Sequence, residues 1–197
     1  MPAASRALVL FAQSGDTRPL RHRGVAAALA EAGLATLLLG LLTETEEVVD
    51  ASTGHLRFDV PLLATRLVDA TDWMRAQSAT SGLRVGYFGA RTGAAAALVA
   101  AAARPTAVSA VVSRGGRPDL AAHVLEQVQA PTLLIVGGDD LPVITLNREA
   151  LKRLHVESVL EIVPGAGHRF EDPGALASVT DLARRWFERH LTRPPAS

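Results

Sequence analysis

The sequence predicts a three-layer α/β/α sandwich built on a mostly parallel, six-stranded sheet. Six short apolar segments alternate along the chain with longer segments of helical period, and this alternation is typical of parallel strands joined by helical crossovers. The chain has 197 residues, of which 48% are hydrophobic, so it can bury one sizeable core. We therefore expect a single domain over residues 1–197, with an ordered core at about 7–191.

The apolar segments have the length and composition of strands that are buried on both faces of a sheet. Each is short, carries at most one charged residue, and ends in polar or glycine-rich sequence. The predicted strands are residues 7–12, 34–39, 83–88, 107–112, 131–136 and 158–163.

The segments between the strands carry apolar residues at the three- and four-residue spacing of amphipathic helices. The clearest stripe consists of Leu63, Leu67, Ala70 and Met74. Glycine or proline lies at several of the expected helix ends, where such residues stop or start a helix. The predicted helices are residues 20–32, 60–77, 92–103, 118–128, 143–154 and 173–191.

Residues 43–59 carry several acids and no clear period, so they are expected to form a long surface excursion after the second strand. His55, Arg57 and Asp59 lie at the end of this excursion, directly before a helix. We interpret them as residues that fix the loop rather than as residues that perform chemistry.

Composition excludes several classes of partner. Lysine plus arginine equals aspartate plus glutamate at 20 each, so a chain of zero net charge is not expected to bind nucleic acid or an anionic membrane. Residues 25–42 are apolar enough to resemble a membrane span, but Glu31 and Gly33 interrupt them. The chain has no cysteine and no segment typical of a secretory signal. We expect a soluble, cytoplasmic protein.

Metal and cofactor sites are not predicted. Away from the candidate site described below, the histidines His22, His123, His155 and His190 lack the paired spacing of metal ligands. No glycine-rich phosphate loop is present, and the glycines at 137–138 lack the third glycine of a dinucleotide fingerprint. We therefore expect neither a metal nor an organic cofactor.

The sharpest local signal is the segment 83–97, in which an apolar strand runs through two closely spaced glycines into an alanine-rich helix. This strand, tight turn and helix is the layout of a nucleophile elbow, with Gly89 and Gly93 at the positions that must be nearly free of side chain. The apex of the elbow is Arg91. A guanidinium stays protonated and has no lone pair with which to attack, so it cannot act as a nucleophile.

Two further residues follow later strands in the order of a catalytic triad. Asp140 follows the fifth strand, and His168 follows the sixth between Gly165 and the next helix. The carboxyl ends of parallel strands share one edge of the sheet, so both side chains should lie near Arg91. A carboxylate there could hold the imidazole in one tautomer and leave its other nitrogen as an acid or base.

These segments together resemble the dienelactone-hydrolase-like family of the α/β hydrolases, in its short form without leading antiparallel strands. The resemblance runs from about residue 7 to 191. It is carried by TGHLRFD at 53–59, GARTG at 89–93, VSRGGRPD at 112–119, LIVGGDD at 134–140 and PGAGH at 164–168.

The resemblance implies a minimal α/β-hydrolase fold with an acyl-transfer pocket for esters or lactones. It places the family's aspartate on Asp140, rather than on Asp139, and its histidine on His168. It also exposes two departures. The family's serine or cysteine falls on Arg91, and its oxyanion loop, which donates a backbone N–H, falls on Gln13 and the residues that follow.

Several interpretations of the site residues stay open. Arg91 could bind an anionic ligand or fold onto Asp140 as an ion pair. Ser14 is more typical of a turn than of a displaced nucleophile. Arg114 and Arg117 form a basic pair that we interpret mainly as solvated loop charges, with a second anion contact as the alternative. The predicted ligand contacts are Arg91, Thr92, Gln13, Ser14 and Arg114, beside the acid–base pair His168 and Asp140.

Three functional hypotheses follow. In the first, His168 and Asp140 move a proton while Arg91 binds a small anionic substrate, which permits proton transfer, elimination or cyclisation without a covalent intermediate. In the second, an inactive hydrolase relative binds a small molecule or a protein. In the third, water activated by His168 hydrolyses an ester or lactone slowly. The sequence leaves open whether the chain forms a homodimer.

Overall fold

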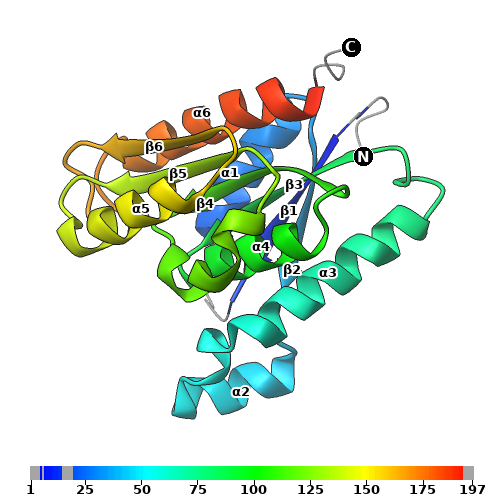
Figure 1. Cartoon of the computed structure of the whole chain (residues 1–197), viewed down its shortest axis with the longest axis horizontal. Helices are drawn as coiled ribbons and strands as arrows, with labels where there is room; N and C mark the ends of the chain where they lie inside the picture. Colours follow the sequence, from blue (N-terminus) through cyan, green and yellow to red (C-terminus); the bar gives the residue numbers. More distant parts are fainter. Residues whose placement is uncertain (1–4, 6, 15–19, 193–197) are drawn as a thin grey trace.

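The computed structural model of the chain describes residue 5, residues 7–14 and residues 20–192. At its centre lies a sheet of six strands in the order β2-β1-β3-β4-β5-β6, with every pairing parallel (Figure 1). The predicted α/β architecture is confirmed. The strands are β1 (Ala7–Gln13), β2 (Ala35–Gly40), β3 (Arg84–Ala90), β4 (Val108–Arg114), β5 (Thr132–Gly137) and β6 (Ser158–Val163).

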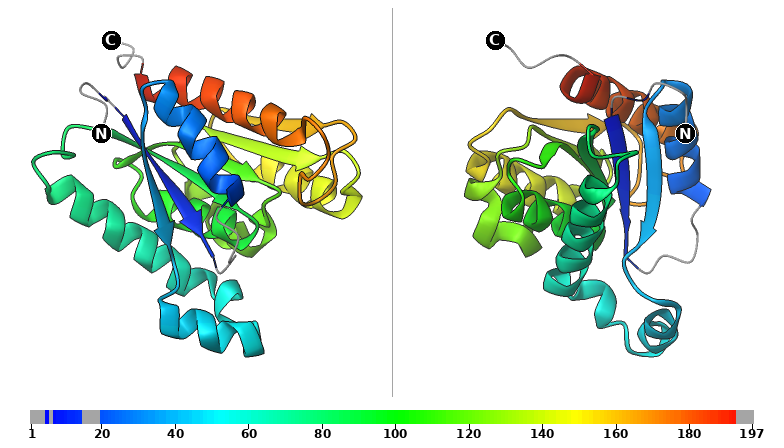
Figure 2. Two further views of the ribbon diagram at one scale, coloured as in Figure 1. Left: turned by 180° about the vertical axis from the view of Figure 1, so that it is seen from behind. Right: turned by 90° about the vertical axis from the view of Figure 1, so that its right-hand side faces the viewer.

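Helices cover both faces of the sheet. Figure 2 shows α1 and α6 on one side of the strands and α3, α4 and α5 on the other. The helices of the sandwich are α1 (Leu20–Glu31), α3 (Val60–Ala76), α4 (Thr92–Ala103), α5 (Leu141–Arg153) and α6 (Ala175–Phe187). A 3-10 helix, η2 (Pro118–Gln127), replaces the α-helix expected after β4, and α6 continues as a short π-helix, η3 (Glu188–Thr192).

Burial on both faces explains why the strands appear in the sequence as unbroken apolar runs. In β1, Leu8 and Leu10 pack into the core beneath α3 and α4, while Val9 and Phe11 pack into the core beneath α1 and α6. Because successive side chains of a strand point to opposite faces, neither face of a central strand can be polar.

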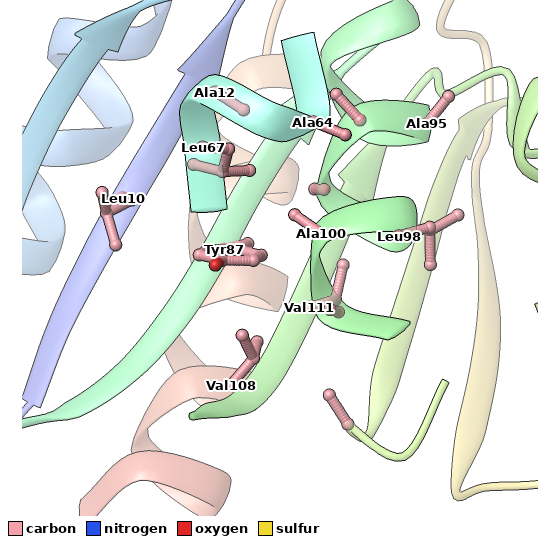
Figure 3. Packing of buried hydrophobic residues seen from close by; sticks show 14 of the residues in the cluster. Leu10, Ala12, Ala64, Leu67, Tyr87, Ala95, Leu98, Ala100, Val108 and Val111 are labelled. Carbon is pink, nitrogen blue, oxygen red and sulfur yellow. The ribbon is translucent and has the colours of Figure 1, made fainter. Parts of the chain in front are cut away.

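The larger core surrounds one buried tyrosine, seen near the centre of Figure 3. The hydroxyl of Tyr87 lies 2.6 Å from that of Thr71 on α3, which gives the buried oxygen a partner. Burial in this apolar setting raises the pKa of Tyr87 to about 12, so the phenol stays neutral.

The excursion at 43–59 is more regular than the sequence indicates. It forms α2 (Glu44–Thr53) and the 3-10 turn η1 (Leu56–Phe58), which project beyond the sheet (Figure 1). The surface excursion expected here contains a helix that the sequence pattern did not predict, because capping and not hydrophobic period defines it. Thr43 and Glu46 form a reciprocal capping box, and Gly54 ends the helix in the left-handed conformation.

Residues at the end of the excursion fix it in place, as interpreted from the sequence. Asp50 accepts hydrogen bonds from the backbone and the guanidinium of Arg57, with the guanidinium Nε at 2.6 Å. Burial opposes ionisation of Asp50, but these donors outweigh it and lower the pKa of the carboxyl. Asp59 caps α3 by accepting from the backbone N–H of Leu62 at 3.0 Å.

We expect Glu46→Gln to weaken the attachment of α2 at neutral pH. Two hydrogen bonds from Arg66, with the backbone N–H of Thr43, lower the pKa of Glu46 from 4.5 to about 2. A depressed carboxyl pKa adds stability above pH 4.5, and this stability is lost as the pH falls toward 2. Thermal unfolding at several pH values should show a lower melting temperature for the variant at pH 7 and a shallower acid dependence between pH 4.5 and 2. Glu44→Gln, in the same turn, should leave both unchanged.

No helix among the described residues is both long enough and apolar enough to cross a bilayer.

Candidate active site

The predicted elbow is present, and Arg91 is its apex. Arg91 alone separates β3 from α4, and its backbone has φ 52° and ψ −121°. Residues other than glycine rarely adopt this backbone conformation. The backbone strain persists only where the surrounding structure enforces it. Here the backbone N–H of Arg91 donates to Arg114 at 3.4 Å, and the Arg91 carbonyl accepts from Arg117 at 3.2 Å.

The two elbow glycines are required by close packing of strand against helix. A Cβ atom on Gly89 would lie 2.5 Å from the Cα of Ala94, and one on Gly93 would collide with the carbonyl oxygen of Ala12. In both cases the obstacle is backbone, which cannot move aside as a flexible side chain can. The glycines let α4 start directly against the ends of β1 and β3.

This contact lies where the strand order reverses. The chain leaves β1 for β2 on one side and then returns past β1 to β3 on the other. Open α/β sheets bind ligands at the carboxyl ends of strands on either side of such a switch point. The loop after β1 and the elbow after β3 therefore meet at the position where the fold places a ligand.

Side chains of the β1 loop confirm this meeting. The Ser14 hydroxyl oxygen lies 2.7 Å from that of Thr92, the first residue of α4. Gln13 instead turns toward α1, where its amide nitrogen lies 3.1 Å from Nδ1 of His22. Gly15 and Asp16, which belong to the same predicted loop, lie outside the described residues.

Asp140 and His168 form the predicted pair. Oδ2 of Asp140 lies 2.6 Å from Nδ1 of His168, and the Asp140 side chain is 11% exposed while that of His168 is 43% exposed. Asp140 occupies the N-cap position of α5 but makes no side-chain capping hydrogen bond. Asp139 is exposed, and its backbone N–H donates to the Ala166 carbonyl in the loop before His168 at 3.1 Å. The side-chain partner described for Asp140 is His168.

The segment after β4 connects the elbow to His168. Arg114 and Arg117 hold the backbone of Arg91, as described above, and Gly115 between them lies against the chain at His168. A Cβ on Gly115 would stand 3.4 Å from the His168 carbonyl oxygen. The structure thus brings Arg91 and the Asp140–His168 pair to one edge of the sheet through a continuous set of backbone contacts.

The basic pair at Arg114 and Arg117 differs from the expectation of solvated loop charges. Arg117 makes two hydrogen bonds to Asp119, at 2.8 and 2.7 Å, which raise the pKa of Arg117 and lower that of Asp119. Arg114 is only 6% exposed, so the prediction of a solvated charge there was wrong. The predicted strand ends at residue 112, whereas β4 continues to Arg114. Arg114 is buried because it belongs to the strand and not to the loop after it.

Sequence reasoning also missed Phe170. This residue lies two positions after His168, is 3% exposed, and has a positive φ of 52°. The ring stands beneath the Arg114 guanidinium, with 5.9 Å from the guanidinium carbon to the ring centroid. The only indication of its burial in the sequence was that a large apolar residue lies in an otherwise polar loop.

Within the part of the chain that the structure describes, no three or more residues of His, Cys, Asp or Glu are grouped so that they could hold a metal ion.

Relatives in sequence include two proteins from strains of Mycobacterium tuberculosis, each named "Putative phosphoribosyl transferase". Each is 52% identical over 199 residues, a match that takes in 100% of this chain and 44% of the relative. The chain thus spans less than half the length of the curated relatives it matches.

Solved structures show the same fold over nearly the whole chain. A dienelactone hydrolase from Anabaena variabilis is 57% identical, with a TM-score of 0.94 over 97% of this chain and 89% of that one. A dienelactone hydrolase-like promiscuous phosphotriesterase from metagenomic libraries has a TM-score of 0.73 at 20% identity, over 96% of this chain and 88% of that one, and shares the fold alone. The family model for dienelactone hydrolases matches residues 9–191. With an elbow, an aspartate and a histidine in the family's order, and with this match over nearly its full length, the chain belongs to the dienelactone hydrolase family.

Proposed function

We propose that the site binds a small anionic substrate and moves a proton without forming a covalent intermediate. The observation that carries this proposal is the 2.6 Å contact between Asp140 and His168 at an edge of the sheet where the elbow presents arginine instead of a nucleophile. Proton transfer, elimination and cyclisation all fit a site that has an acid–base group and a cation but no attacking atom.

Three features of the elbow favour an anion. Arg91 carries a permanent positive charge at the apex, and the first N–H groups of α4 directly follow it with no acidic residue in the first helical turn. The hydroxyl groups of Ser14 and Thr92 lie beside that helix end and can donate further hydrogen bonds. An oxyanion placed here would meet charge, helix dipole and hydroxyl donors together.

His168 is the acid–base group of the proposal. An ionised carboxylate only accepts hydrogen bonds, so pairing with Asp140 assigns the proton to Nδ1 and leaves Nε2 for the substrate. The His168 side chain is 43% exposed, as suits a group that meets a substrate. A positioned acid or base of this kind contributes about 10²- to 10⁴-fold in rate.

A phosphate ester is the anion that we favour over a carboxylate. The printed name of the Mycobacterium tuberculosis relatives refers to a phosphoribosyl group, and those relatives are 52% identical to this chain over 100% of its length and 44% of their own. Arginine and helix N-termini are also the usual protein groups for phosphate.

The second candidate is a family member that binds the same anion without turning it over. The replacement of the attacking residue by Arg91 favours this candidate, because loss of a triad nucleophile costs about 10⁶ in rate. Slow hydrolysis by water activated at His168 would be a remnant of the family's chemistry.

We expect Arg91→Gln to lower affinity for ribose 5-phosphate by about tenfold or more, since a charge-assisted hydrogen bond contributes about 1.5 to 3 kcal/mol. Isothermal titration calorimetry with ribose 5-phosphate would measure this loss of affinity. Titrations with inorganic phosphate and acetate would separate phosphate recognition from carboxylate recognition.

Arg104→Gln is the matched control, because Arg104 lies at the opposite end of α4 and pairs with Asp72 at 2.7 Å. Equal affinity in wild type and Arg91→Gln would contradict the anion site. Binding without turnover over a range of pH would support the second candidate.

A further inference from the structure

A buried arginine packs against the loop that carries His168. Arg114 is the last residue of β4, and its guanidinium carbon lies 5.9 Å from the centroid of the Phe170 ring. This distance is within the range of a cation–π contact, which gains strength where water is excluded. Burying a charged group is costly, so the aromatic face offsets part of the cost of keeping Arg114 at 6% exposure.

Phe170, together with Ala166, attaches the His168 loop (residues 164–174) to the core near the imidazole. It is 3% exposed and packs in the core cluster that includes Val163 and Ala166, whereas His168 faces outward. Its backbone has positive φ and donates to the Gly167 carbonyl at 3.0 Å, which closes a tight turn around His168. Because Phe170 and His168 share this turn, we expect movement of the Phe170 ring to displace the imidazole.

Backbone contacts make the same connection on the other side. Gly115 follows Arg114 directly, and a Cβ there would lie 3.4 Å from both the His168 carbonyl oxygen and the Phe170 ring. Gly115 is itself held by donating to the Ile135 carbonyl at 2.7 Å. The end of β4 therefore supports the His168 loop through main chain and side chain together.

We propose that Arg114 is a positioning residue that holds His168 against Asp140 through Phe170, rather than a group that contacts substrate. The functional meaning of this inference rests on the acid–base role proposed for His168. The positioning role itself is tested by spectroscopy without substrate. If the proposed activity were absent, the test of the positioning role would still be valid.

We expect Arg114→Met to weaken the pair between Asp140 and His168 in the ligand-free protein. NMR of ¹⁵N-labelled histidine reports the tautomer and the Nδ1 proton directly. The variant should shift the His168 signals by at least half of the change that Asp140→Asn produces. Arg117→Met is the matched control, since Arg117 pairs with Asp119 and should leave the His168 signals unchanged.

Two further variants separate positioning from loss of folding. Arg114→Lys retains the cation and should restore most of the wild-type signals. Phe170→Leu removes the ring while the arginine stays, and it should reproduce the effect of Arg114→Met even where that variant fails to fold. Unchanged His168 signals in a folded Arg114→Met or in Phe170→Leu would overturn the inference. So would an Arg117→Met effect equal to that of Arg114→Met.

Discussion

Replacing Arg91 with serine is expected to turn this chain into an ester hydrolase. The structure has the elbow conformation at Arg91, the contact between Asp140 and His168 and the start of α4 directly after residue 91, so a serine there would occupy the apex of the bend. Because removal of a triad serine costs about 10⁶ in rate, even a poorly aligned serine should raise kcat/KM by about 10²-fold or more. Hydrolysis of p-nitrophenyl acetate and covalent labelling by a fluorophosphonate would measure the gain.

Arg91→Ala is the matched control for this gain, because it removes the guanidinium without supplying a nucleophile. The double variant Arg91→Ser with His168→Ala should lose the gained activity if the histidine acts as base. A folded Arg91→Ser protein that neither hydrolyses nor labels would contradict the expectation and indicate that the oxyanion donors or the acid are misplaced. Labelling of wild type at Ser14 would show that the nucleophile had moved rather than disappeared.

A methyl group at Gly89 is expected to destabilise the fold strongly. In Gly89→Ala the new Cβ would stand 2.5 Å from the Cα of Ala94 and 2.5 Å from the Gly93 carbonyl oxygen. Relief requires β3 and α4 to separate, which disturbs the core on that face of the sheet. We expect a loss of about 3 kcal/mol or more in the free energy of unfolding, measured by urea denaturation.

Gly82→Ala is the control for this substitution. Gly82 is exposed before β3, and an added Cβ there meets nothing within 4 Å. Its effect should stay within about 0.5 kcal/mol, as for ordinary surface positions. If Gly89→Ala were equally mild, the packing of α4 against the strand end would be looser than the structure has it.

Features that depend on neighbours in the sequence were predicted well. The apolar runs predicted the strands because each strand is buried on both faces, and the glycine spacing at 89–93 predicted the bend because no other residue fits there. The chain order of Asp140 and His168 predicted their meeting, since parallel strands end at one edge. The helix α2 was missed because its caps, rather than a hydrophobic stripe, define it.

The sequence by itself thus determined the layers of the fold and the bend between strand and helix at residue 91. The tertiary structure alone decided which side chains are buried at the site. Whether Arg114 meets water depends on how far β4 extends and on how residues 164–174 fold across its end. Burial and partner choice arise from segments distant in the chain, and no local pattern of residues encodes a contact between a strand end and a loop some fifty positions later.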